Sequence, residues 1–346
     1  MSFLNKTLST GIGSFPHQNT DDALGFILSC FKDDIIFWPQ LPKKSFLEQM
    51  TFQFSEKLPG VVIDSRNKKI SVDTQKNSFT GELEECFQHY LDEDLDFFSV
   101  SREYASGLYA LTDVLSKDKD LVKHGIIKGQ IVGPITLGMM ILTEKQQPII
   151  YHPELKEALV KLLSMKAAWQ VEKLKKINSN NKIIIFIDEP YLVSFGSSFF
   201  TLKKEDVVDI LNEVIDAIGK QGALCGIHCC ANTDWSLIFS SRVDIVSFDA
   251  YGYLDNLMLY TDELKGFLNR GGVLSFGLIP NSEEAENNNK KAELIAKVEE
   301  ARKKLDNIGE VLITSSCGCG TLDLGLSETV SRLSCEIAHS LSSGVS

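Results

Sequence analysis

Long apolar runs are absent from this sequence. The two best candidates, residues 135–142 and 183–187, are too short to cross a bilayer, which takes about 20 helical residues. The first residues also lack the apolar segment of a secretory signal, because the turn glycines Gly11 and Gly13 follow almost directly. These absences predict a cytoplasmic protein with no membrane partner.

Positive charge is also in short supply. Lys and Arg together number 35 against 47 Asp and Glu, so the formal net charge is −12, and only six residues are arginine. A chain this acidic repels the phosphate backbone, so no nucleic-acid partner is expected. With 43% hydrophobic and 24% charged residues, the composition is that of a globular protein and excludes a disordered chain.

A disulfide framework is not needed, because a chain of 346 residues can bury a sufficient core by itself. The eight cysteines are therefore expected to be reduced, either as free thiols or as metal ligands. Cys30, Cys86 and Cys335 lie in helical patterns and Cys225 in the interior of a strand pattern, where filling the core or the surface is the expected role.

The sequence does contain a repeated alternation of short β-branched runs and longer amphipathic stretches. The predicted strands are residues 8–13, 35–38, 126–132, 183–187, 223–227, 244–248, 273–276 and 311–314. Helical spacing of apolar residues marks 153–177, 204–220, 292–305 and 326–341. Eight strands alternating with helices predict an α/β protein, a single (β/α)₈ TIM barrel spanning residues 1–346 as one domain. A β-hairpin insertion is predicted near residues 58–74.

Metal-binding residue types collect at the carboxyl ends of these strands, where a TIM barrel places its active site. His228 and Cys230 are two residues apart, so they lie on one side of the extended chain while Cys229 points to the other. Cys317 follows the last strand, and Asp249 could add an oxygen. Imidazole nitrogen and thiolate sulfur are zinc ligands, so a zinc site is predicted. The alternative is that these cysteines only fill the core.

Two further strand ends carry polar residues. Asp188 and Glu189 follow a strongly apolar strand, where a carboxylate can meet a substrate ammonium or act as a base; a helix cap or a salt bridge is the alternative. Ser14 lies in a Gly-Ser-Phe-Pro turn whose backbone N–H groups could receive a carboxylate.

Five stretches in this order resemble the catalytic domain of cobalamin-independent methionine synthase, a relative of uroporphyrinogen decarboxylase. They are residues 12–16 (IGSFP), 133–136 (GPIT), 187–190 (IDEP), 228–230 (HCC) and 317–318 (CG). The resemblance covers nearly the whole chain. It implies a TIM-barrel methyltransferase of methionine biosynthesis in which zinc binds the acceptor thiol.

The resemblance also implies roles for individual residues. His228, Cys230 and Cys317 would be the zinc ligands, with Asp249 at the position where the family has a longer glutamate. The segment Ile12, Gly13 and Ser14 would hold the substrate carboxylate, and Asp188 its amino group.

Two departures from the family leave the substrates open. The family's Gly-Glu-Pro-Glu-Arg-like segment, whose glutamate helps hold the homocysteine amine, has no counterpart here. The folate-binding amino-terminal half is also absent, so the chain is closer to the short single-domain members. The acceptor is then homocysteine or a related thiol, and the donor a methylfolate or a methylated corrinoid protein.

The expected mechanism is that zinc holds the acceptor as a thiolate, which attacks the methyl group in line. Two alternatives remain. A porphyrinogen-type decarboxylase would need an arginine cluster, which the first-strand loop lacks. A non-catalytic zinc-binding or thiol-binding homologue would keep the site without the methyl-transfer chemistry.

Overall fold

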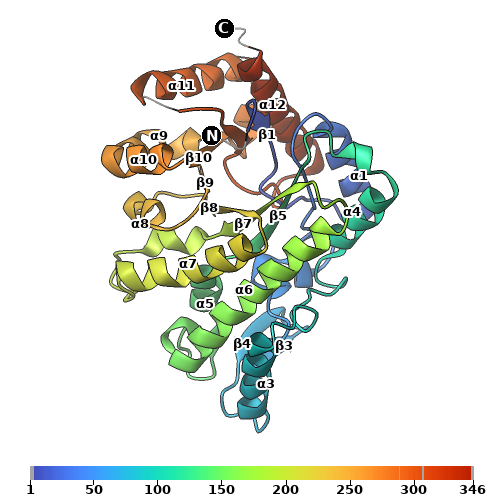
Figure 1. Cartoon of the computed structure of the whole chain (residues 1–346), viewed down its shortest axis with the longest axis vertical. Coiled ribbons are helices and arrows are strands. Elements are labelled where there is room, and N and C mark those ends of the chain that lie inside the picture. Colours follow the sequence, from blue (N-terminus) through green and yellow to red (C-terminus); the bar gives the residue numbers. More distant parts are fainter. Residues whose placement is uncertain (1–3, 288, 306–307, 344–346) are drawn as a thin grey trace.

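The computed structural model describes residues 4–287, 289–305 and 308–343. An eight-stranded parallel sheet curls through its centre, and helices cover its outside (Figure 1). In chain order the strands are β1 (Leu8–Ser9), β2 (Ile36–Phe37), β5 (Ile126–Val132), β7 (Lys182–Asp188), β8 (Leu224–Cys229), β9 (Ile245–Phe248), β10 (Val273–Ile279) and β11 (Leu312–Ser315). Each of the eight predicted strand segments overlaps one of these strands in an α/β fold, but the first is much shorter than predicted, with residues 8–9 in place of 8–13.

Strand alternation separates the two faces of the curled sheet. Ile184 and Phe186 of β7 belong to a small buried cluster with residues of β1, β9, β10 and β11, so they face the inside of the curl. Ile183, Ile185 and Ile187 belong to the main core with the surrounding helices. Both faces of β7 are therefore buried, which explains its continuous β-branched run. By the same alternation the next residue, Asp188, faces inward.

The two edge strands of the sheet, β1 and β2, lie next to each other. The Ile35 N–H donates to the Ser9 carbonyl at 3.0 Å, and the Gln40 N–H donates to the Gly13 carbonyl at 2.9 Å. These bonds bring the two ends of the sheet together, in agreement with a TIM-like barrel. We call this junction between β1 and β2 the seam of the sheet. The strands that form it are short, since β1 and β2 have two residues each.

The helices lie between the strands in sequence. They are α1 (Thr20–Cys30), α2 (Met50–Gln53), α3 (Phe79–Leu91), α4 (Ser106–Lys117), α5 (Pro134–Met140), α6 (Pro153–Lys175), α7 (Lys204–Lys220), α8 (Trp235–Ser240), α9 (Ala250–Met258), α10 (Thr261–Asn269), α11 (Lys290–Lys304) and α12 (Leu324–Ser342). The four helices predicted from apolar spacing correspond to α6, α7, α11 and α12. In the described part of the chain, none of these helices combines the length and the apolar character that crossing a membrane requires.

The predicted hairpin region forms part of a larger element. Strands β3 (Val61–Asp64) and β4 (Lys69–Val72) pair antiparallel, and Asp64 Oδ1 closes the turn by accepting from the Arg66 and Asn67 N–H groups. A third strand, β6 (Leu142–Thr143), pairs with β4 in parallel. The element is thus a three-stranded sheet rather than a hairpin alone. Figure 1 shows β3 and β4 beside α3, away from the curled sheet.

Candidate metal and substrate site

Three side chains from distant parts of the sequence meet at one end of the curled sheet. The ligand atoms of His228, Cys230 and Cys317 all lie within 4.8 Å of one another. His228 is on β8 and Cys230 directly follows this strand, whereas Cys317 follows β11. Cys229 points away, and its thiol donates to the Ala231 carbonyl at 3.4 Å. The predicted convergence is confirmed, and metal binding by these residues stays a prediction.

Hydrogen bonding orients the imidazole toward this cluster. His228 is only 3% exposed, and its Nδ1 lies 3.0 Å from the Ser247 hydroxyl of β9. Its Nε2 is buried and has no hydrogen-bond partner among the described residues. Histidines that bind a metal through one ring nitrogen typically form a hydrogen bond through the other, as Nδ1 of His228 does with Ser247.

The two sulfur atoms are chemically unequal. A hydrogen bond from the Cys230 thiol lowers the pKa of Cys317 to about 4, and neighbouring His228 contributes in the same direction. The same hydrogen bond, together with burial, raises the pKa of Cys230. The two sulfur atoms lie within 4.8 Å of each other and of the His228 ring, in a place where a cation could hold both. One nitrogen and two sulfur donors fit zinc, which has four protein ligands at structural sites and three protein ligands plus an exchangeable fourth at catalytic sites.

Asp249 does not join the cluster. It follows β9 and caps α9, because its Oδ1 accepts from the Gly252 N–H at 2.8 Å. Among the described residues, His228, Cys230 and Cys317 are the only group of three or more His, Cys, Asp or Glu side chains whose ligand atoms lie within 4.8 Å of one another. Burial raises the pKa of Asp249, as expected for a partly enclosed carboxylate. Its ligation of a metal stays a prediction and requires the side chain to leave the cap.

Asp188 offers a buried carboxylate beside the cluster. It ends β7 and stands opposite His228 in the parallel register. Its Oδ1 is buried and lacks a hydrogen-bond partner in the described chain. Burial raises the pKa of Asp188 to about 6, although His228 and the ammonium of Lys128 oppose the shift. A desolvated carboxylate with a free oxygen suits a cationic ligand group.

The Ser14 turn packs directly on the Cys317 turn. The Ser14 carbonyl accepts from the Cys319 N–H at 2.9 Å, and its hydroxyl accepts from the Gly320 N–H at 3.2 Å. A Cβ atom on Gly318 would lie 2.1 Å from the Ser14 hydroxyl oxygen, so a larger residue here would displace that side chain. These contacts place two predicted motifs, about 300 residues apart, in one site.

The backbone of this turn has unused donors. The carbonyls of Ile12 and Gly13 accept from Lys128 Nζ at 2.7 Å and from the Gln40 N–H at 2.9 Å. The N–H groups of Ile12, Gly13 and Ser14 have no acceptor within the described residues. Gly13 has φ +146°, a conformation that favours glycine. Successive free N–H groups can bind an anion, as predicted for the substrate carboxylate.

The sequence analysis missed two residues of this site. Lys128 on β5 is fully buried, and its Nζ donates to the Ile12 carbonyl and lies 3.4 Å from Gln130 Oε1. The sequence did contain a signal for Lys128, because a lysine is unusual inside a strand that is buried on both faces. Asn281 follows β10, and its Nδ2 donates to the carbonyls of Cys317 and Gly318 at 3.1 and 2.9 Å. Nothing local in the sequence distinguishes this asparagine from a loop residue.

Glu189, next to Asp188, has a structural role. It is fully buried, and its carboxylate accepts from the N–H groups of Ile135 and Thr136 at 3.0 and 2.8 Å and from the Thr136 hydroxyl at 2.6 Å. It therefore caps α5 from a neighbouring strand end. A Cβ atom on Gly133 would lie 2.0 Å from this carboxyl group, which explains the glycine.

Replacing Glu189 by alanine should lower the free energy of unfolding by about 2–4 kcal/mol, because three buried donors lose their acceptor and a cavity remains. Urea denaturation measures this loss. Glu144 is the matched control, since its carboxylate also accepts from a backbone N–H and a threonine hydroxyl but on the surface. Glu144→Ala should cost less than about 1 kcal/mol. Equal losses in both variants would contradict the buried cap.

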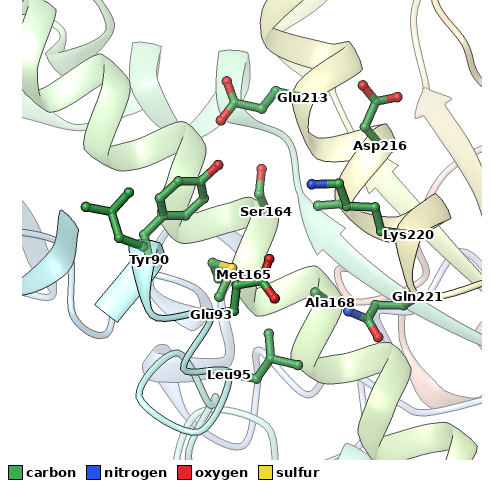
Figure 2. A pocket seen from close by; sticks show the side chains of 12 residues that line it. Tyr90, Glu93, Leu95, Ser164, Met165, Ala168, Glu213, Asp216, Lys220 and Gln221 are labelled. Atoms are coloured by element: carbon green, nitrogen blue, oxygen red, sulfur yellow. The ribbon is translucent and has the colours of Figure 1, made fainter. Parts of the chain in front are cut away.

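A pocket of about 590 Å³ lies on the outside of the sheet among α3, α6 and α7 (Figure 2). Two of its acidic residues are already paired, Glu213 with Lys161 and Asp216 with Arg242. Its lining includes none of the residues of the candidate site. The chemistry-bearing residues therefore lie at the end of the sheet and not in this pocket.

Comparisons with known proteins bear on the fold. No protein-family model and no curated protein matches the chain. Among solved structures, the chain is similar to the putative vitamin-B12 independent methionine synthase of Listeria monocytogenes, with 15% sequence identity and a TM-score of 0.56. The match covers 97% of this chain and 98% of the other. At this identity the likeness shows that the two proteins share a fold.

Proposed function

We propose that this chain is a zinc-dependent methyltransferase that activates a thiol for methyl transfer. The observation that carries the proposal is the convergence of His228, Cys230 and Cys317 at the end of the curled sheet. One nitrogen and two sulfur donors with room for a further ligand are typical of catalytic zinc. The fold shared with a protein named as a methionine synthase supports the same class of reaction.

The residues around the cluster suit an amino-acid thiol, homocysteine or a close relative. Bound zinc would supply a positive charge that keeps a coordinating thiol deprotonated at neutral pH. The free N–H groups of residues 12–14 would receive the substrate carboxylate, and the free Asp188 Oδ1 its ammonium. Ser247 holds the His228 ring, and Asn281 holds the Cys317 turn. Held at both ends, the substrate presents its sulfur to the cluster.

The methyl donor is proposed to be a methylcorrinoid, carried by a partner protein, or a methylfolate. Neither nucleic acid nor a membrane is a proposed partner, because the chain carries a formal net charge of −12. The donor would approach from the open end of the sheet, because the thiolate must attack the methyl carbon in line.

The arginine distribution disfavours a porphyrinogen decarboxylase. Arg102 and Arg242 pair with Asp113 and Asp216 on the surface, and Arg270 donates to the Phe239 carbonyl. Within residues 4–287, 289–305 and 308–343, no arginine contacts the His228 cluster or the Ser14 turn by a hydrogen bond or an ion pair. An acidic substrate would lack cationic partners there.

The test is methyl transfer with and without metal. Zinc-loaded protein is incubated with homocysteine or related thiols and either methylcobalamin or methylfolate, and the methylated thiol is measured by mass spectrometry. We expect turnover that falls at least about 100-fold after chelation and returns with zinc. Full activity without metal contradicts the proposal. Zinc and thiol binding without turnover identifies a non-catalytic homologue instead, and the Asp249 cap favours that alternative.

A further inference from the structure

A second pair of thiols lies away from the candidate site, behind the seam between β1 and β2. The sulfur atoms of Cys30 and Cys335 are 3.9 Å apart, although the residues are 305 positions apart in the chain. Cys30 ends α1 and is partly exposed, whereas Cys335 lies within α12 and is 5% exposed. We propose that these two thiols form a reversible disulfide that fastens the seam of the sheet.

The geometry brings the sulfurs to the point of contact. A disulfide needs the two sulfur atoms to approach from 3.9 Å to about 2.05 Å. Cys335 packs in a small apolar cluster with Phe15, Ile27 and Phe31, and Cys30 packs against the same cluster. This cluster is separate from the main core of the protein.

The position of the pair explains what a bond would do. α1 connects β1 to β2, and α12 packs on β11 and β1. A Cys30–Cys335 bond would therefore join the helices on the two sides of the seam. The seam is otherwise held by two-residue strands and a few hydrogen bonds. A covalent bond between the helices beside it would therefore stabilise this junction of the sheet.

Along both helices the pair lies away from the candidate site, with Cys30 at the end of α1 and Cys335 in the middle of α12. α1 begins soon after the Ser14 turn and ends at Cys30, and Cys335 is eighteen residues beyond Cys317. Near the thiols, buried Asp34 precedes β2 and pairs with His339 at 2.9 Å. A bond here would stiffen the fold without covering the Ser14 turn or the His228 cluster.

The two thiols differ in a way that orders the reaction. A hydrogen bond with Cys30, together with burial, raises the pKa of Cys335, so the more exposed Cys30 is the thiol that reacts first. The Cys30 thiolate attacks a low-molecular-weight disulfide such as glutathione disulfide and releases one small thiol. Cys335 then loses its proton, attacks the Cys30 sulfur and displaces the second small thiol. Two protein thiols are oxidised, and one small disulfide is reduced to two thiols.

The experiment uses the zinc-loaded full chain, equilibrated with millimolar glutathione disulfide or with dithiothreitol. Digestion without reduction, followed by mass spectrometry, identifies which cysteines are linked. We expect a peptide that joins Cys30 to Cys335, and a melting temperature about 5 °C above that of the reduced protein. Dithiothreitol should reverse both changes.

Variants separate the bond from general effects. Cys30→Ser should lose the cross-linked peptide and the thermal gain, and Cys335→Ala should do the same. Cys86→Ala is the control, because Cys86 is a buried thiol of α3 with no sulfur partner in the described chain. It should keep both the peptide and the gain. Each variant is compared with its own reduced form, so a change in basal stability cancels.

The outcomes are decisive. Failure of wild type to give the Cys30–Cys335 peptide overturns the proposal, as does a thermal gain that survives in Cys30→Ser. A cross-link confined to Cys230 and Cys317 also overturns it, since that bond belongs to the candidate metal site. None of these readouts requires methyl transfer, so the result is independent of the proposed function.

Discussion

Replacing Cys317 by serine is expected to reduce bound zinc from about one ion per chain to below about a tenth. A serine hydroxyl stays protonated near neutral pH, so it cannot replace the thiolate. Only His228 and Cys230 of the three clustered side chains would remain, both from the end of β8. We expect the affinity to fall at least about 1,000-fold, because each ligand contributes several kcal/mol. Metal analysis after dialysis measures the content, and competition with a chelator measures the affinity.

Cys229→Ser is the matched control for this experiment. Cys229 is adjacent to two proposed ligands, but its thiol donates to the Ala231 carbonyl and faces the other way. A serine hydroxyl can keep that hydrogen bond, so this variant should retain wild-type zinc. Retention of zinc by Cys317→Ser, or the same loss in Cys229→Ser, would remove the basis for the metal site.

Asp188→Asn is expected to lower kcat/KM for an amino-acid thiol by about 100-fold to 1,000-fold while leaving the zinc content unchanged. The Asp188 Oδ1 is buried without a partner, so an ionic bond to the substrate ammonium would form in a desolvated setting. Asparagine has nearly the same shape but carries no charge. Steady-state kinetics with the proposed acceptor, together with metal analysis, gives the two values.

A substrate lacking the amino group provides the control for Asp188. Wild type and Asp188→Asn should transfer methyl groups to such a desamino thiol at rates within about threefold of each other. This substrate has no ammonium group, so removing the Asp188 charge breaks no ionic bond to it. An equal loss for both substrates would show that Asp188 serves another purpose. An unchanged kcat/KM for the amino-acid thiol would show that Asp188 does not hold the ammonium.

The ligand cluster shows how far local sequence could lead. Alternation along an extended strand predicts that His228 and Cys230 share a side and that Cys229 does not, which is what the structure has. Parallel strands end at one edge, so Cys317 could be placed with them without coordinates. The strands themselves were recognisable because both faces of a parallel sheet are buried, which demands continuous apolar runs.

Other residues show where local sequence failed. Asp188 and Glu189 are adjacent acids after one strand, yet one faces the site with a free oxygen and the other caps α5. Asp249 follows a strand end as the proposed ligands do, but in the structure it caps the first turn of its own helix, and its ligation of a metal stays a prediction. β6 was missed because a two-residue strand has no periodicity and exists only through its pairing with β4.

The eight strands, their order with the helices and the end of the sheet where the reactive residues collect could be inferred from the sequence, because they follow from burial and strand alternation. The folded structure was needed to show which carboxylates are free, that Lys128 and Asn281 support the site, and that Cys30 lies against Cys335. Those features depend on contacts between side chains far apart in the chain. Such contacts leave no pattern in neighbouring residues, because packing and hydrogen bonding act on distance in space.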